Sequence, residues 1–262
     1  MTTLIAAIER NFRAKLQYIP SIHDTMCVSE FANTTIIDSG MPSGRFNAAY
    51  GGSIDLETAT RVSEYYASKN LPMAWWIGPE ADANYDVKSS MQQVGFVHDE
   101  YYVGMACDLK TLTLPAYELP EGFSIVECAK QQHYEDFGFV LSSVFNPIDP
   151  HVQKFYKQIA TIPEECRESL ILLVGYCNGK PVSTAAVFMT DVAGIYEVAT
   201  MPNQQKQGFG SAIFYAALKY AKSTACHYAV LQASPDGLNI YKRFCFKEVC
   251  GFNVWSNKKI LS

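Results

Sequence analysis

The same order of strands and helices occurs twice along this chain, on either side of a segment that disfavours both helix and sheet. That segment runs from Leu114 to Gly122 and carries two prolines and a glycine, which interrupt regular backbone hydrogen bonding. We therefore predict two domains, 1–114 and 122–262, connected by a linker at 115–121. With 262 residues, 48% of them hydrophobic, the chain is long enough to bury a core in each domain.

The second half is predicted to mix strands and helices around one hairpin. Asn178-Gly179 separates two apolar runs, and this dipeptide accepts the positive φ angles of a tight turn. Strand 195–200 leads through a glycine-containing loop into a helix with an apolar stripe. Ser234-Pro235-Asp236 have the chemistry of a helix start, and a short helix is predicted from there through Phe244. The remaining elements are strands 123–127, 170–177, 181–190, 228–233 and 246–255 and helices 130–145 and 150–161.

The first half repeats the later part of this order, which indicates an internal duplication and an α/β (α+β) fold class. In detail, Gly95-Phe96 precedes the last strand of the first half as Cys245-Phe246 precedes that of the second. Trp75 and Trp76 lie in a predicted buried strand and are expected to belong to the core. The elements of the first half are strand 45–51, helix 55–68, strand 71–78, a helix at 85–94 and strand 100–109.

Bulk properties exclude several classes of protein. The N-terminal segment has apolar residues at helical spacing and does not look like a signal peptide, and no run of about 18 apolar residues predicts a membrane span. A net charge of −5 argues against nucleic acid as a partner. The eight cysteines and five histidines show no zinc-ligand spacing, so no metal site is predicted. We expect a cytoplasmic protein with reduced thiols, without nucleic-acid or membrane partners.

The segment from Val198 to Ser211 carries the strongest functional signal. A strand ends, and glycines at 208 and 210 open a helix, whose first N–H groups lack internal partners and lie at the positive end of the helix dipole. This arrangement suits a diphosphate, although two glycines alone are equally compatible with a plain tight turn. A dinucleotide fingerprint needs Gly or Ala where Ile213 stands, and the Gly-Lys-Ser/Thr of a Walker loop never occurs.

The same segment, read as Gln205-x-x-Gly208-x-Gly210, resembles motif A of the GNAT N-acetyltransferase superfamily. Downstream, Ser234 and Tyr241 stand seven residues apart as in the family's motif B, whereas Cys245 replaces the glycine usual before the phenylalanine. The resemblance spans about 122–262. It implies two lobes, each with a mixed, mostly antiparallel sheet flanked by helices, the first being a degenerate repeat without the glycine motif. Its Ser53-Ile54-Asp55-Leu56 stands where the motif is expected.

The resemblance further implies acetyl-CoA as cosubstrate and a small-molecule or peptide amine as acceptor. Pantetheine is expected to bind the backbone of Val198 and Thr200 like an additional strand. For Lys206, the backbone N–H matters more to this hypothesis than the charged side chain. The implied cofactor-binding residues are Val198, Ala199, Thr200, Gln205, Lys206, Gln207, Gly208, Phe209, Gly210, Ser211 and Ser234.

Tyr241 and Glu197 are the candidate catalytic residues. Tyr241 is expected to hydrogen-bond or protonate the leaving sulfur. A phenol pKa of about 10 against a thiol pKa near 8.5 makes full proton transfer unfavourable by roughly 2 kcal/mol, a gap that burial against the cofactor is expected to shrink. Glu197 is the candidate base, if burial raises its pKa. Strand alternation, however, turns it away from Val198 and Thr200, so that an outward-facing charge is the alternative.

Several alternatives stay open at this point. Asp191, His227 or a chain of water molecules are other routes for the amine proton. A core aromatic is the alternative role of Tyr241, on the stripe with Leu238 and Phe244. A non-catalytic acyl-CoA sensor and a protein-interaction module are the rival functions. Acceptor, acyl length and the choice between monomer and homodimer do not follow from the sequence.

Overall fold

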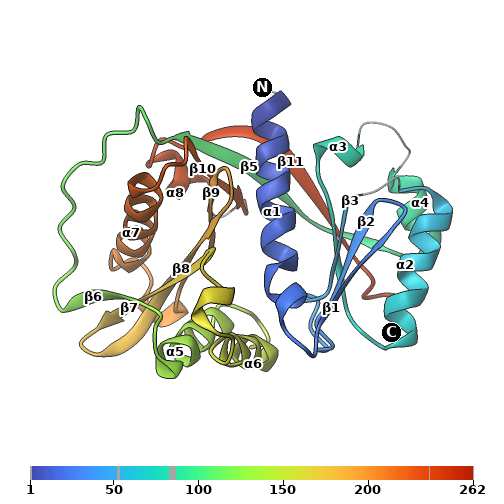
Figure 1. Ribbon diagram of the computed structural model, residues 1–262, viewed down its shortest axis with the longest axis horizontal. Coiled ribbons are helices and arrows are strands. Elements are labelled where there is room, and N and C mark those ends of the chain that lie inside the picture. The colour runs from blue at the N-terminus through green and yellow to red at the C-terminus, as the bar shows by residue number, and fades with distance from the viewer. Residues whose placement is uncertain (1, 52–53, 83–86, 236, 262) are drawn as a thin grey trace. The chain divides into compact units, whose positions relative to one another are not determined.

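The computed structural model describes residues 2–51, 54–82, 87–235 and 237–261 and divides the chain into two compact units (Figure 1). The first unit combines 1–105 with 232–238 and 248–262, and the second combines 106–231 with 239–247. Two C-terminal segments thus belong to the unit that is built mainly from the N-terminal half. The predicted linker at 115–121 is coil, but a domain boundary there stays a prediction.

The first unit is a mixed sheet with helices, as the fold class predicted. Its strand order is β1-β2-β3-β4-β11-β5, with β3 and β4 parallel and β1-β2, β2-β3 and β4-β11 antiparallel. Its elements are α1 (Thr2–Ile22), β1 (Cys27–Phe31), β2 (Thr34–Asp38), β3 (Ala48–Gly51), α2 (Leu56–Ser68), β4 (Ala74–Ile77), α3 (Pro79–Asp82), α4 (Val87–Val94), most of β5 (Val97–Asp108) and most of β11 (Lys247–Ser256).

The core of this unit lies around β4. Trp75 is fully buried, as predicted, and its ring meets Phe96 edge-on at 5.6 Å. Strand β11 pairs antiparallel with β4, which sets Trp255 opposite Trp75 and adds it to the same core. The hairpin of β1 and β2 was not predicted. The predicted helix at 85–94 is observed as α4, and its residues 85 and 86 lie outside the described part of the chain.

The second unit is a mostly antiparallel sheet with strand order β10-β9-β8-β7-β6. Asn178 and Gly179 have φ angles of 50° and 75°, which confirms the predicted hairpin turn between β7 and β8. Its elements are β6 (Phe123–Glu127), α5 (Gln131–Ser142), α6 (Pro150–Ile159), η1 (Glu164–Cys166), β7 (Leu170–Cys177), β8 (Lys180–Met189), β9 (Ala193–Thr200), η2 (Pro202–Gln204), α7 (Phe209–Ser223), most of β10 (Tyr228–Ala233) and most of α8 (Leu238–Lys242).

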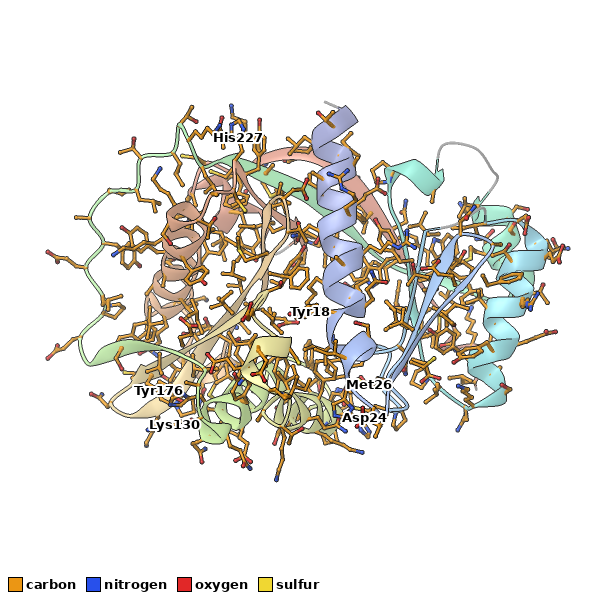
Figure 2. All side chains as sticks on the ribbon, viewed as in Figure 1. Tyr18, Asp24, Met26, Lys130, Tyr176 and His227 are labelled. Carbon is orange, nitrogen blue, oxygen red and sulfur yellow. The ribbon has the colours of Figure 1, made fainter. Side chains whose placement is uncertain are left out.

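Helices cover both faces of this sheet. The central strand β8 is buried without interruption from Val182 to Phe188. In a sheet with one solvated face, buried and exposed residues would alternate along the strand instead. Helices α7 and α5 both pack on β8 and β9, and α6 lies beside α5 (Figure 1). Within the second unit, Tyr176 of β7 lies beside the start of α5, where Lys130 is the N-cap, and donates to Asp136 at 2.7 Å (Figure 2).

The turn before the last strand of each repeat has the same backbone geometry. Gly95 and Cys245 have φ angles of 100° and 65°. Each donates to the carbonyl three residues earlier, and the following phenylalanine donates to the carbonyl five residues earlier, which belongs to Met91 in one repeat and Tyr241 in the other. This match supports the internal duplication and sets Met91 at the position of Tyr241.

Candidate functional site

The loop between β9 and α7 has the backbone conformation that its glycines allow. After Thr200, a 3-10 turn leads to Lys206, with a φ of 62°, and then to Gly208, with a φ of 85° at the N-cap of α7. A left-handed φ favours glycine because other residues meet steric strain there. The side chain of Phe209 then anchors the helix, since it is buried and stacks on Phe123 at 5.0 Å.

The exposed loop offers unpaired backbone donors. Gln205, Lys206, Gln207 and Gly208 are exposed, and Gly210 and Ser211 are half-buried. The first N–H group of α7 that forms a hydrogen bond to the loop belongs to Ala212, which donates to the Gly208 carbonyl at 3.0 Å. Within the described residues, no intramolecular acceptor is seen for the N–H groups of 205–211. Grouped donors at a helix N-terminus form an anion site, so the loop fits a diphosphate.

Gly210 lets the first turn of α7 approach the end of β9 closely. A Cβ atom on Gly210 would lie 3.0 Å from the hydroxyl oxygen of Thr200. The side-chain amide of Gln205 also donates weakly to the Thr200 carbonyl, at 3.4 Å. Both motif glycines therefore have a steric function: Gly208 in the turn and Gly210 in the contact with the strand.

Within the second unit, the structure describes pairing of β9 with β10 only at the start of β9. The parallel pairing described for β9 and β10 within the second unit covers only Ala193 with Ala229 and Gly194 with Val230. On its other side, β9 pairs with β8 up to Thr200, which lies opposite Ser183. Backbone groups of Val198 and Thr200 are thus near a strand end where an extended ligand could add hydrogen bonds, while Ala199 is buried opposite Thr184.

Glu197 does not follow the strand alternation assumed from the sequence. It has a φ of 54°, and the β8–β9 register slips there, so that Glu197 and Val198 together oppose Ala185. This β-bulge interrupts the regular alternation of the strand, so the prediction that alternation turns Glu197 away from Val198 and Thr200 loses its premise. Glu197 is half-buried, and its charge adds to the effect of burial in raising the pKa of the Tyr156 phenol on α6 well above its usual value.

Tyr241 lies on α8 within an aromatic group. Its ring centroid is 5.0 Å from that of Phe214 on α7 and 6.3 Å from that of Phe246. Burial raises the pKa of Tyr241 to about 12. This widens the gap to a thiol pKa near 8.5, and full proton transfer becomes unfavourable by about 5 kcal/mol. The expectation that burial against the cofactor shrinks this gap stays a prediction, and hydrogen-bond donation is the role that the raised pKa matches better.

Ser234 is not the N-cap of a helix. Its carbonyl accepts from Gly237 at 3.0 Å and Leu238 at 3.2 Å, and α8 begins only at Leu238. The predicted capping by the Ser234 hydroxyl and the predicted helix start at Pro235 are therefore wrong, because the chain makes a turn first. Asp236 lies outside the described residues. Ser234 also belongs to the segment grouped with the first unit, unlike the loop at 205–211.

His227 has a partner of its own. It lies just before β10, at the end of the second unit away from Lys130 and Tyr176 in Figure 2, and its Nε2 atom is 3.4 Å from Asp108. Its ring stacks on Tyr228 at 4.3 Å. Asp191 lies in the turn between β8 and β9, at the opposite end of β9 from the glycine loop. Both positions make these residues poorer candidates for the base than Glu197.

Two further properties bear on ligands. Among the helices that the structure describes, none is both long and apolar enough to cross a membrane. No cluster of three or more His, Cys, Asp or Glu side chains suited to a metal is found in the described ranges. Tyr156 is the residue at the candidate site that the sequence did not indicate, since a tyrosine in an amphipathic helix carries no signal that it lies near Glu197.

Comparison with known proteins identifies the type of fold. Residues 131–252 match the model described as "Acetyltransferase (GNAT) family". No curated protein matches the chain. A GCN5-related N-acetyltransferase from Kribbella flavida shares the fold, with a TM-score of 0.69 and 16% identity over 95% of each chain.

Two further solved structures match nearly the whole chain. A functionally unknown conserved protein from Staphylococcus epidermidis has a TM-score of 0.63 and 15% identity over 91% of this chain and 96% of its own. A tandem GNAT protein from the clavulanic acid biosynthesis pathway has a TM-score of 0.58 and 11% identity over 94% of this chain and 86% of its own. At such identities these likenesses concern the fold, and they include a protein with two GNAT repeats.

Proposed function

Since residues 131–252 belong to the acetyltransferase (GNAT) family, we propose that the protein transfers an acetyl group from acetyl-CoA to a primary amine. The observation that carries the proposal is the exposed loop at 205–211, whose N–H groups have no intramolecular acceptor among the described residues and adjoin the N-terminus of α7. Acetyl-CoA, when bound, supplies the acetyl group as a thioester.

The loop and β9 are the proposed binding elements. The N–H groups of the loop bind the diphosphate, while Gly208 allows the left-handed turn and Gly210 allows the close approach of α7 to Thr200. The backbone of Val198 and Thr200, beyond the paired start of β9, aligns the pantetheine. Holding the thioester in one orientation makes attack by a bound amine effectively unimolecular.

Glu197 and Tyr241 are the proposed catalytic residues. Glu197 takes the proton from the amine, and the neutral amine forms the new C–N bond as the C–S bond breaks. Tyr241 donates a hydrogen bond to the departing sulfur, a role that its high pKa permits because the phenol stays protonated at any physiological pH. Hydrogen-bond donors aimed at developing charge are a common source of transition-state stabilisation.

The first experiment is a thermal-shift titration with acetyl-CoA, CoA and ATP, on the wild type and on Gly208→Glu. We expect both CoA species to stabilise the wild type, by about 2.7 kcal/mol at 100 times Kd, and ATP not to. Gly208→Glu adds a side chain and a negative charge to the loop and should abolish the shift. A wild type that responds to no CoA species would remove the proposed site.

Turnover tests the assigned chemistry. With a panel of amine acceptors, Tyr241→Phe should keep its affinity for CoA and lose about 10- to 1,000-fold in kcat. The ring and its contacts with Phe214 remain in this variant, so only the hydroxyl is tested. Binding of CoA without turnover on any amine would favour the alternative, a non-catalytic acyl-CoA sensor or interaction module.

A further inference from the structure

The coil between β5 and β6 is fastened to α7 at several points along the helix. This segment, the strap (residues 112–120), contains most of the predicted linker and runs beside α7 (Figure 1). In the last turn of α7, the Lys222 ammonium donates to the carbonyl of Leu109 at 2.8 Å and to that of Leu112 at 2.6 Å. The strap therefore begins beside the C-terminal end of the helix.

Two tyrosines hold the middle of the strap. The ring of Tyr117 stacks on that of Tyr215 in α7, with a centroid distance of 4.9 Å and an interplanar angle of 24°. The Tyr215 hydroxyl donates to the Pro115 carbonyl at 2.7 Å. Tyr117 also packs against the apolar cluster that contains Phe209, the first residue of α7. The chain of the strap thus runs from the last turn of the helix toward its first turn.

The end of the strap lies against the turn that opens α7. A Cβ atom on Gly208 would lie 3.4 Å from the Cγ atom of Pro120, which is ordinary van der Waals contact. The Pro120 carbonyl accepts from the Phe123 N–H at 3.0 Å, and the Phe123 ring stacks on Phe209 at 5.0 Å. Pro120 and Phe123 therefore pack against the N-cap and the first residue of α7.

The loop at 205–211 has few restraints of its own. No intramolecular acceptor is seen for its N–H groups within the described part of the chain, and the side-chain amides of Gln205 and Gln207 form only long hydrogen bonds, both of 3.4 Å. Such a loop binds a ligand well only if other contacts order it beforehand, since each residue that becomes ordered on binding lowers the affinity. The contact between Pro120 and Gly208 is suited to this task.

We infer that the strap is a positioning element of the CoA site, which holds the turn at Gly208 in the conformation that binds the diphosphate. This inference rests on the proposed function and deepens it, because it assigns part of the affinity for CoA to the segment that connects the two halves of the sequence. Pro120 acts through Gly208, and Tyr117 acts through Pro120 by keeping the strap on α7. Neither side chain has to touch the ligand for this role.

Pro120→Ala tests the contact with the loop. It removes the Cγ atom that lies nearest to Gly208 and releases the φ angle that proline fixes. We expect Kd for CoA and KM for acetyl-CoA to rise about 5- to 30-fold, the effect of ordering roughly one residue anew in each binding event. The kcat at saturating acetyl-CoA should stay unchanged, because the chemical step is not altered. A Kd equal to that of the wild type overturns the inference.

Tyr117 and Lys222 separate positioning from general stabilisation. Tyr117→Ala removes the stacked ring and should weaken CoA binding about 3- to 10-fold, whereas Tyr117→Phe keeps the ring and should bind CoA like the wild type. Lys222→Met is the matched control at the far end of the strap. It removes the hydrogen bonds to Leu109 and Leu112 and should lower the stability of the protein without changing Kd. Equal Kd values in the two Tyr117 variants, or an equal rise in Kd in Lys222→Met, overturn the inference.

Amide exchange on the wild type gives a test that does not depend on the folding of any variant. If the attached strap favours CoA binding, bound CoA must favour the attached strap by the same factor. Exchange at Tyr117, Glu118 and Leu119 should therefore become slower when CoA saturates the protein. Unchanged exchange at CoA concentrations that give the full thermal shift contradicts the inference and leaves the proposed function standing. A wild type without any thermal shift removes the proposed CoA site and the inference with it.

Discussion

Cys245 stands in a backbone conformation that glycine adopts most easily. Its φ is 65°, and the matching position of the first repeat is Gly95. A left-handed conformation strains an L-residue by about 1–2 kcal/mol. We expect Cys245→Gly to raise the free energy of unfolding by about 0.5–1 kcal/mol, after the larger unfolded-state entropy of glycine is subtracted. Denaturant unfolding measures this, and Cys245→Ala, which keeps the strain, should not share the gain.

Tyr241 makes a second residue-scale prediction, on stability at alkaline pH. Its folded pKa of about 12 lies above the unfolded value near 10, so between these limits the unfolded state loses its proton first. Stability conferred below pH 10 is lost as pH rises to 12. Relative to Tyr241→Phe, the wild type should lose up to about 2–3 kcal/mol over this window, in unfolding followed by circular dichroism. Parallel curves for the two proteins would contradict a buried phenol.

At the scale of elements, the approach of α7 to β9 depends on Gly210. Gly210→Ala would bring a Cβ to 3.0 Å from the Thr200 hydroxyl and push the first turn of α7 outward. We expect a Kd for CoA about 5- to 10-fold weaker, a loss near 1–1.4 kcal/mol. Thr200→Ala in the same chain removes the opposing atom and should restore binding, since the proposed contacts of Thr200 use its backbone. Calorimetric titration decides, and no rescue would refute the steric explanation.

Local sequence patterns predicted most elements but not the details of the candidate site. The hairpin at Asn178-Gly179 and the helix after Gly208 follow from residues with special backbone freedom, which act locally. The bulge at Glu197 could not be predicted, because it depends on the register with β8 and on the Thr184 hydroxyl, both of which are contacts distant in sequence. The N-cap expected of Ser234 failed for a different, local reason, since a turn whose N–H groups bond to the Ser234 carbonyl precedes α8.

Across the whole molecule, the two repeats differ where an anion would bind. The N-cap of α7 is Gly208, which has no side chain to cap the helix, whereas the carboxylate of Asp55 caps α2 and accepts from Thr58 N–H at 2.8 Å. This hydrogen bond lowers the pKa of Asp55, so a negative charge already occupies that helix terminus and disfavours a diphosphate. With Met91 at the position of Tyr241, the first repeat lacks both proposed functions, which supports its interpretation as degenerate. Ser53, which belongs to the same predicted segment, lies outside the described residues.

The strand β11 ties the C-terminal end of the sequence to the first unit. It pairs with β4, and just beyond it the buried side chain of Asn257 accepts from Met73 N–H at 2.9 Å and donates to the Leu71 carbonyl at 3.0 Å. A fragment of residues 1–114 lacks these contacts and the ring of Trp255 in the core. We therefore expect the fragment to show no cooperative unfolding transition by circular dichroism, although its boundary follows the break in the sequence.

The full-length variant Asn257→Ala provides the quantitative counterpart of that fragment. It leaves two buried backbone groups of the first unit without partners, each worth about 1–3 kcal/mol. The first unit should therefore lose about 2–6 kcal/mol, seen as faster amide exchange in β4, while the β7–β8 hairpin of the second unit keeps its protection. The opposite outcome is a 1–114 fragment that unfolds cooperatively and an Asn257→Ala variant whose stability is unchanged. It would show that the N-terminal repeat is stable without β11 and that the domain boundary lies at the break in the sequence.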